Sequence, residues 1–471
     1  MYLGLDLGTS SLKALLIDEA QRVVGEATAP LTVERPHPGW SEQHPDSWIA
    51  ACRTVLAELG DLSGVRAIGL SGHMHGATLV GAEGRALRPC LLWNDTRAAT
   101  EAEGMDDAEA RRVTGNIVFP GFTAPKVEWV RRHEPEVFAA ADLVLLPKDY
   151  LRLWLTGEAW TDMSDASGTA WLDVGARDWS DDLLARSGLS RAHMPAATEG
   201  TGIAGRVSAA CAAATGLPAG VPVAGGAGDN AAAAVGTGAV APGQGFVSLG
   251  TSGVLFVSTA RYAPDPASVV HSFCHAVPDT WHQMGVILSA TDSLEWAARL
   301  TGRRAAELTA GTLKAPDRTL FLPYLGGERT PHNDAAIRGT LTGIEHATDA
   351  AALGRAVMAG VGYALRDSLD ALRVTGTPVD RLLAVGGGAA SDHWLRMIAT
   401  ILDLPLEVPG DGAFGAALGA CRLAMMADGA DASVAATPAI ARTVAPDPAL
   451  TAAFADGHAR FKAAYAPTRT L

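Results

Sequence analysis

Two short runs of small polar residues, about half a chain apart, could each bind phosphate. Asp6-Leu-Gly-Thr-Ser-Ser11 recurs as Ser248-Leu-Gly-Thr-Ser-Gly253, and each copy lies between two apolar runs. A turn of small residues exposes backbone N–H groups and hydroxyls, which together make a concave anion site. An ordinary β-hairpin with a polar rim is the alternative. The candidate phosphate ligands are Gly8, Thr9, Ser10, Gly250 and Thr251.

Two carboxylates could add the chemistry of group transfer. Asp6 precedes the first turn, where a carboxylate can hold a hydrated Mg²⁺, which typically binds through water and one or two carboxylates. Asp229 and Asn230 precede the alanine run 231–234. Aspartate is a favoured N-cap, and the positive potential at a helix start would also keep a general base ionised. Both interpretations of Asp229 are compatible.

Three further groups each follow an apolar run and end it with polar or small residues. His73-Met74-His75-Gly76 could hydrogen-bond a polar ligand, whereas metal binding would need a third ligand that is not evident nearby. Trp93-Asn-Asp95 has the composition expected at the open end of a strand. Gly386-Gly-Gly388 would let a flat ligand such as adenine approach, or would simply make a tight strand-to-helix connection. Each group could equally have a structural role.

Periodicity predicts mixed α/β architecture around these groups. Residues 2–7, 12–18 and 22–27 alternate as an antiparallel meander, followed by a helix over 45–60 and a buried strand over 65–71. The second Gly-Thr-Ser turn follows and precedes similar apolar runs, so we expect two domains of related design. Later predictions are helices over 282–300, 349–374, 391–402 and 414–427, strands over 319–325, 381–386 and 404–408, and a peripheral helix or loop over 438–465.

Composition narrows the class of protein. The 471 residues carry a net charge of −14, so nucleic acid is not expected as a partner, because its binding requires a positive surface. The five cysteines are widely separated and form no CxxC pair, which fits a reducing cytoplasm. No run of about 18 apolar residues is present, so we expect no membrane span.

Together these features resemble the FGGY carbohydrate kinases, in the superfamily of actin, hexokinase and Hsp70-like ATPases. Asp6–Ser11 resembles the first phosphate loop, Ser248–Gly253 the second, and Gly386–Gly388 the adenosine loop. Residues 121–133 are similar to the first signature of the family. The second signature is matched at Gly339, Leu341, Gly343 and Ile344 but not at Ala352 and Ala359.

Within this family, six segments are similar to members that phosphorylate D-xylulose. His73 stands where glutamine is common in those members. The six segments are residues 35–43, 74–78, 92–95, 146–152, 162–165 and 327–332.

The resemblance implies two ribonuclease H-like α/β domains with an active-site cleft between them. We expect sugar binding and the first phosphate loop in residues 1–238, and ATP binding in residues 239–471. The glycine-rich stretch near 236–245 would contain a hinge, and the C-terminal tail could pack back on the first domain.

The implied reaction transfers the γ-phosphate of ATP to D-xylulose and gives D-xylulose 5-phosphate. By similarity, Asp229 would be the general base, and Asp6 would organise Mg²⁺ through water. The implied partner is a small-molecule sugar, and a homodimer is compatible with the resemblance. The implied sugar contacts are Met74, His75, Trp93 and Asn230, and the implied ATP contacts are Gly8, Thr9, Ser10, Lys13, Gly250, Thr251, Gly387 and Gly388.

Three other functions stay open at this point. One is a kinase for another small ketose or polyol, such as ribulose or glycerol. A second is a non-catalytic sugar or nucleotide sensor, although a sensor has no need of the carboxylates Asp6 and Asp229. A third is an actin-like assembling ATPase, which the sugar-side segments argue against.

Overall fold

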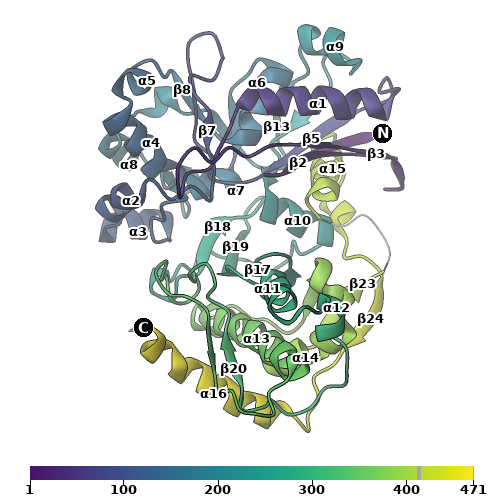
Figure 1. The fold of residues 1–471 in the computed structure, drawn as a ribbon. Helices are drawn as coiled ribbons and strands as arrows, with labels where there is room; N and C mark the ends of the chain where they lie inside the picture. The colour runs from purple at the N-terminus through teal and green to yellow at the C-terminus, as the bar shows by residue number, and fades with distance from the viewer. Residues whose placement is uncertain (411–414, 470–471) are drawn as a thin grey trace.

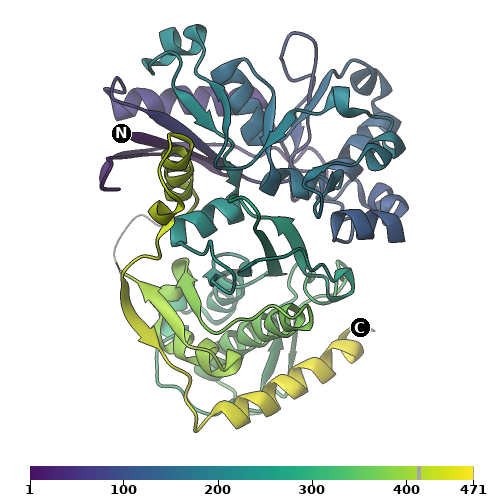
Figure 2. The same cartoon turned by 180° about the vertical axis from the view of Figure 1, so that it is seen from behind.

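The computed structural model describes residues 1–410 and 415–469, which fold into two α/β lobes (Figure 1). The first half of the chain, purple to teal, builds one lobe, and most of the second half builds the other. The view from behind shows the same division (Figure 2). This arrangement confirms the predicted fold class of two α/β domains.

The first lobe contains one large mixed sheet and several short pairs of strands. Its large sheet is made of β1 (Tyr2–Leu7), β2 (Ser11–Ile17), β3 (Val23–Pro30), β5 (Ala67–Gly72), β13 (Ile203–Arg206), β14 (Pro222–Ala224) and β15 (Ala227–Gly228). The short strands are β4 (Glu42–Gln43), β6 (Thr78–Val80), β7 (Cys90–Leu91), β8 (Leu143–Leu145), β9 (Trp160–Asp162), β10 (Leu172–Asp173), β11 (Asp178–Trp179) and β12 (Ala196–Thr198). The helices are α1 (Pro45–Leu59), α2 (Ala99–Met105), α3 (Ala108–Thr114), α4 (Thr123–His133), α5 (Pro135–Ala139), α6 (Pro147–Thr156), α7 (Met163–Ala166), α8 (Asp181–Arg186), α9 (Ala209–Thr215) and α10 (Asp229–Thr237).

The second lobe repeats this plan with a sheet of its own. The sheet is made of β16 (Gly245–Leu249), β17 (Gly253–Thr259), β18 (His271–Cys274), β19 (Trp281–Ile287), β22 (Leu382–Val385), β23 (Leu406–Pro409) and β24 (Ile440–Val444), and a separate pair is β20 (Leu320–Leu322) with β21 (Thr340–Thr342). The helices are α11 (Thr291–Thr301), α12 (Ala305–Leu308), α13 (Ala350–Val374), α14 (Asp392–Leu402), α15 (Ala416–Ala427) and α16 (Thr451–Thr468).

The same motif lies at the centre of each sheet. In the first, β1 and β2 form an antiparallel hairpin, and β5 pairs with β1 in parallel. In the second, β16 and β17 form the hairpin, and β22 pairs with β16 in parallel. The two Gly-Thr-Ser turns are the turns of these hairpins. The predicted meander β1–β2–β3 and the predicted duplication are therefore confirmed.

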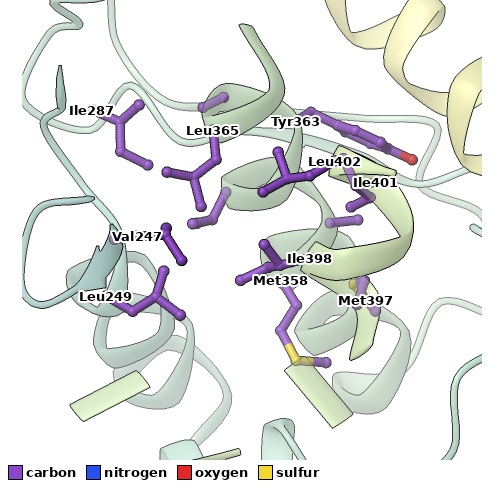
Figure 3. Packing of buried hydrophobic residues seen from close by; sticks show 14 of the residues in the cluster. Val247, Leu249, Ile287, Met358, Tyr363, Leu365, Met397, Ile398, Ile401 and Leu402 are labelled. Carbon is purple, nitrogen blue, oxygen red and sulfur yellow. The ribbon is translucent and has the colours of Figure 1, made fainter. Parts of the chain in front are cut away.

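The core of the second lobe lies between its sheet and two long helices. Figure 3 shows Val247 and Leu249 of β16 facing Leu365 of α13 and Ile398 of α14. These side chains are fully buried. Residues 356–365 of α13 are all buried, because this part of the helix lies between the sheet on one side and other helices, including α14, on the other. This packing fixes the carboxyl ends of β16 and β22, where the second glycine turn and Gly386–Gly388 begin.

Helix α15 follows the second sheet in the chain but packs on the first. It contacts β1, β5 and α10, and Figures 1 and 2 both show it beside the N-terminal strands. A Cβ atom at Gly4 or Gly69 would overlap backbone atoms of α15, so glycine at these two positions permits the close approach. Helix α16, in contrast, packs on α13 and α14 of the second lobe.

Two local predictions were wrong. The helix predicted over 282–300 begins only at Thr291, because residues 281–287 form β19, which pairs with β17 along its whole length. Tertiary pairing overrides the local apolar spacing there.

In the tail, residues 440–444 form an edge strand rather than helix or loop. Of the helix predicted over 414–427, residue 414 lies outside the described residues. Within the described ranges, none of the helices has the length and apolar character of a bilayer span.

Candidate active site

Asp6 and Asp229 meet at one edge of the first sheet. Strand β5 is parallel to β1 and to β15, with Asp6 paired to Ser71 and Gly228 paired to Gly72. Because the carboxyl ends of parallel strands meet at the same edge, Asp6 at the end of β1 lies near Asp229, which directly follows β15. The two carboxylates are close enough for the charge on Asp6 to affect the pKa of Asp229.

Asp229 is the first residue of α10, and the N-cap is Gly228. The N-cap interpretation of Asp229 was therefore wrong by one position. Its Oδ1 accepts hydrogen bonds from the backbone N–H and the Nδ2 of Asn230, at 2.7 and 2.9 Å. Burial and the negative charge of Asp6 raise its pKa to about 6, and the two hydrogen bonds from Asn230 oppose that rise. Such a carboxyl can both accept and release a proton near neutral pH.

Asp6 has the donor chemistry that a divalent cation requires. It is half-buried, and burial raises its pKa, while Ser71 and Lys13 lower it. Lys13 lies opposite Asp6 on β2, but its ammonium group is 3.3 Å from a carboxylate oxygen of Glu26. Two carboxylates, Asp6 and Asp229, thus lie side by side with little compensating positive charge. Hard oxygen donors in this arrangement suit Mg²⁺.

The first glycine turn is held in place by side chains of its own lobe. Thr9 accepts two hydrogen bonds: its hydroxyl from the indole N–H of Trp93, at 3.0 Å, and its carbonyl from Gln43 Nε2, at 2.7 Å. Gly8 N–H donates to the Ser11 carbonyl at 2.9 Å, which closes the hairpin. Thr9 is half-buried and Ser10 is exposed. The turn is therefore open to a ligand and fixed from behind.

The second glycine turn is braced by the start of α11. Thr291 donates its backbone N–H and its hydroxyl to the Gly250 carbonyl, at 2.9 and 2.8 Å, and Ala290 N–H donates to the Thr251 carbonyl at 2.8 Å. Both carbonyls are thus directed away from the open side of the turn, and Thr251 is exposed. Thr291 was missed at the sequence level because it lies 40 residues from the turn.

Met74 and His75 lie beside Asp229. Gly228 approaches the Met74 side chain so closely that a Cβ there would be 2.7 Å from Cγ. The His75 ring stacks on Phe122 with centroids 4.7 Å apart, and its Nδ1 is 2.8 Å from the Gly168 carbonyl. Burial lowers the pKa of His75 to about 3, so the imidazole is neutral. Nδ1 must carry the proton to donate to a carbonyl, which leaves Nε2 as an acceptor.

Gly168 is a second residue that sequence reasoning missed. Its φ is not in the left-handed region, yet a Cβ there would overlap the His75 ring. If His75 is the sugar contact that the resemblance implies, Gly168→Ala should displace the ring and raise the sugar KM about tenfold, since one lost hydrogen bond costs on the order of 1 kcal/mol. The ATP KM should stay within about twofold.

Steady-state kinetics with each substrate varied in turn tests this expectation. Gly104→Ala is the matched control, because a Cβ at Gly104 meets nothing within 4 Å. A sugar KM equal to that of the control would show that Gly168 does not limit the position of His75.

Two cavities lie on either side of the loop that follows β22. The larger, about 710 Å³, extends from Asn230 of α10 to Gly386. The smaller, about 460 Å³, is lined by Gly387 and Gly388 together with Leu294, Ala305, Ala306 and Trp394. Both volumes are in the range of small-molecule sites. A Cβ at Gly387 would meet nothing, so this glycine leaves the wall of the smaller cavity flat.

The structure thus brings most of the candidate residues into one region. Asp6, Asp229, Asn230, Met74 and His75 lie together at the edge of the first sheet. The turns carrying Gly8–Ser10 and Gly250–Thr251 end the two central hairpins, and Gly387 and Gly388 line a cavity of the second lobe. Lys13 instead pairs with Glu26, and Trp93 contacts Thr9.

Comparison with known proteins identifies the family. The model of the N-terminal domain of the FGGY family of carbohydrate kinases matches residues 1–236, and that of the C-terminal domain matches residues 245–427. Xylulose kinase of Escherichia coli (strain K12) is 49% identical over 436 residues, 91% of this chain and 90% of that protein. Xylulose kinase of Bacillus subtilis (strain 168) is 36% identical over 440 residues, 91% of this chain and 88% of that protein.

Solved structures agree with this family over the full length of the chain. A xyloylose kinase from Brucella ovis is 56% identical, with a TM-score of 0.97 over 100% of this chain and 99% of that one. Xylulose kinase from Rhodospirillum rubrum is 30% identical, with a TM-score of 0.92 over 100% and 99%. With both domain models matched and relatives of this similarity, the chain belongs to the FGGY family of carbohydrate kinases.

Proposed function

We propose that this carbohydrate kinase transfers the γ-phosphate of ATP to D-xylulose and releases D-xylulose 5-phosphate and ADP. The observation that carries the proposal is the pair Asp6 and Asp229 at one sheet edge, next to Met74 and His75. The relatives named xylulose kinase support the choice of sugar.

Asp229 is the general base in this proposal. Its Oδ1 is occupied by Asn230, and no hydrogen bond from the described residues reaches Oδ2. Oδ2 takes the proton of the terminal sugar hydroxyl, and the sugar oxygen forms a bond to the γ-phosphorus. The bond from that phosphorus to the β-phosphate oxygen breaks, and ADP leaves with the electron pair. Phosphoryl transfer depends chiefly on such positioning and on charge neutralisation.

His75 and Met74 hold the sugar. The free Nε2 of His75 accepts a hydrogen bond from a sugar hydroxyl, because Nδ1–H is committed to the Gly168 carbonyl. Met74 supplies an apolar wall against Gly228. Because the pKa of His75 is about 3, this contact does not change with pH in the working range. Asn230, which hydrogen-bonds to Asp229, and Trp93, which hydrogen-bonds to Thr9, are assigned to the sugar site as further contacts.

ATP spans the two glycine turns. Gly8, Thr9 and Ser10 of one lobe and Gly250 and Thr251 of the other supply N–H and hydroxyl donors to the phosphates. The cavity beside Gly387 and Gly388 accepts the adenine, because apolar residues such as Leu294 and Trp394 line it and the two glycines leave room for a flat ring. Asp6 would hold Mg²⁺, which neutralises phosphate charge when bound.

In this proposal the first lobe binds the sugar and the second lobe binds most of the ATP. We place the domain boundary at 238/239, after α10, with a hinge near 236–245. Closure of the lobes around both substrates would keep water from the γ-phosphate, since water competes with the sugar as acceptor.

A panel of acceptors tests the proposed sugar. Purified protein is given ATP, Mg²⁺ and one of D-xylulose, ribulose, glycerol or gluconate, and ADP formation is measured by a coupled assay. The highest kcat/KM is expected for D-xylulose. A higher kcat/KM for another acceptor would replace D-xylulose as the proposed substrate. If no acceptor in the panel supported ADP formation, the result would favour a non-catalytic sensor.

The acid limb of the pH profile of kcat/KM should reflect the ionisation of Asp229. The base must be ionised, so kcat/KM for the sugar should rise tenfold per pH unit up to about pH 6 and then level off. Burial, the largest cause of the raised pKa, sets this midpoint above that of an ordinary carboxyl. Initial rates from about pH 5 to pH 9 measure it. A profile that is flat between pH 5 and pH 6 would contradict Asp229 as the base.

A further inference from the structure

A fully buried ionic cluster lies behind the sugar site. The ammonium of Lys148 in α6 is 2.7 Å from Asp149, 2.8 Å from Asp162 and 3.0 Å from Asp165. All four side chains are 0% exposed. Removing charges from water is costly, and well-packed apolar residues often stabilise a fold as well or better. Stability alone is therefore a weak explanation for this cluster.

The cluster keeps its charges paired. Burial lowers the pKa of Lys148, but the three carboxylates raise it by more than burial lowers it. The ammonium group therefore stays cationic. Burial raises the pKa of Asp165 well above its usual value, which Lys148 only partly opposes. Arg152 supplies the second cation, and it donates to the carbonyls of Ala224 and Gly225 at 2.5 Å each. Gly226, β15 and Asp229 follow these two residues in the chain.

A short chain of hydrogen bonds connects the cluster to Asp229. Asp162, held by Lys148 through Oδ2, uses Oδ1 to accept from the Ser164 backbone N–H at 2.8 Å and from its hydroxyl at 2.5 Å. The Ser164 Oγ in turn accepts from the Gly228 N–H at 3.1 Å. Gly228 is the residue before Asp229, so this chain of hydrogen bonds ends one residue away from the proposed base.

The same segment contacts the sugar site and the other lobe. Its residue Gly168 offers the carbonyl to which His75 donates. Ser167 accepts a hydrogen bond through Oγ from the Cys274 N–H of β18, at 3.0 Å. Residues 162–168 therefore contact Gly228, which precedes the proposed base, as well as a proposed sugar contact, His75, and the second lobe.

We propose that Ser164, held by Asp162 and Lys148, is a positioning residue that sets Asp229 in place for proton transfer. The inference rests on the proposed role of Asp229 as the base, but not on the identity of the sugar. A displacement of about 1 Å at a reacting group can cost on the order of 10²-fold in rate. A serine whose loss only loosened packing would lower stability without lowering kcat in this way.

The test is Ser164→Ala, measured with the acceptor that the wild-type protein phosphorylates best. We expect kcat to fall about tenfold or more, while the ATP KM stays within about twofold. Ser164→Cys should act in the same direction, because sulfur keeps the volume but accepts hydrogen bonds poorly. Thr161→Val is the matched control: Thr161 lies on β9, three positions before Ser164, and its buried hydroxyl has no hydrogen-bond partner among the described residues.

A double-mutant cycle separates positioning from packing. In an Asp229→Asn background, Ser164→Ala should no longer change the residual kcat, since the group it positions is gone. The positioning role is overturned if both Ser164 variants keep kcat within about twofold of Thr161→Val. It is also overturned if Ser164→Ala costs as much in the Asp229→Asn background as in the wild type. If D-xylulose proves not to be the acceptor, these ratios are still measured with the acceptor that is.

Discussion

Asp229→Asn is expected to lower kcat for sugar phosphorylation by at least about 10²-fold, the lower end of what a general base contributes. The amide keeps the shape of the side chain and its contact with Asn230, but it cannot take a proton. The KM for ATP should change by less than about threefold, because no nucleotide contact is assigned to Asp229. The measurement is ADP formation at saturating sugar and ATP.

The thermal stability of Asp229→Asn distinguishes a catalytic role of Asp229 from a structural one. Burial raises the pKa of Asp229 to about 6, so the folded protein disfavours its ionised form at pH 8. A neutral amide removes that penalty, and the midpoint of thermal unfolding at pH 8 should not fall. Asp456→Asn, the same change on the exposed side of α16, serves as the control. A kcat close to that of the control would remove Asp229 from the mechanism, and a large loss of stability would point to a structural role instead.

Local patterns in the sequence predicted the parts of the fold that depend on local chemistry. The meander β1–β2–β3 was predictable because alternating apolar residues and a Gly-Thr-Ser turn specify a hairpin without distant partners. Asp229 at the start of α10 was predictable to within one residue, since small residues and a following alanine run mark a helix start. The duplication was visible because both hairpins use the same turn.

Long-range packing was not predictable in the same way. The apolar face of α15 could equally have covered the second sheet. Its position on the first sheet depends on Gly4 and Gly69, whose missing side chains leave room for the helix backbone. Lys148 is a charged residue on a short helix, which in a sequence indicates a solvated position; its burial depends on Asp162 and Asp165, which lie on a later strand and helix.

The proposed sugar contact His75 illustrates the same limit. His75 could be singled out as a polar residue after a strand, but the atom that makes its Nδ1 a donor is the carbonyl of Gly168, 93 residues away. The backbone of His75 also has a φ of 71°, which no local pattern indicated. Which nitrogen faces the ligand is therefore a property of the folded chain only.

Asp6→Asn should be nearly as damaging as the change at Asp229, and for a different reason. We expect kcat to fall on the order of 10²-fold, because the amide removes a charge that helps to hold the cation neutralising the transferred phosphate. The Mg²⁺ concentration that gives half-maximal rate should rise at least about tenfold. Titrating Mg²⁺ at fixed ATP and sugar measures both quantities.

The same substitution should change the titration of its neighbour in a defined direction. The charge on Asp6 is the second cause, after burial, of the raised pKa of Asp229. Without that charge the ionised form of Asp229 is favoured, so the acid limb of the kcat/KM profile should move to lower pH in Asp6→Asn. Lys13→Met provides the matched comparison, because loss of a nearby positive charge should leave the Asp229 limb unmoved or shift it upward. An Asp6→Asn profile that moves to higher pH, or an unchanged requirement for Mg²⁺, would show that the two carboxylates do not share one site.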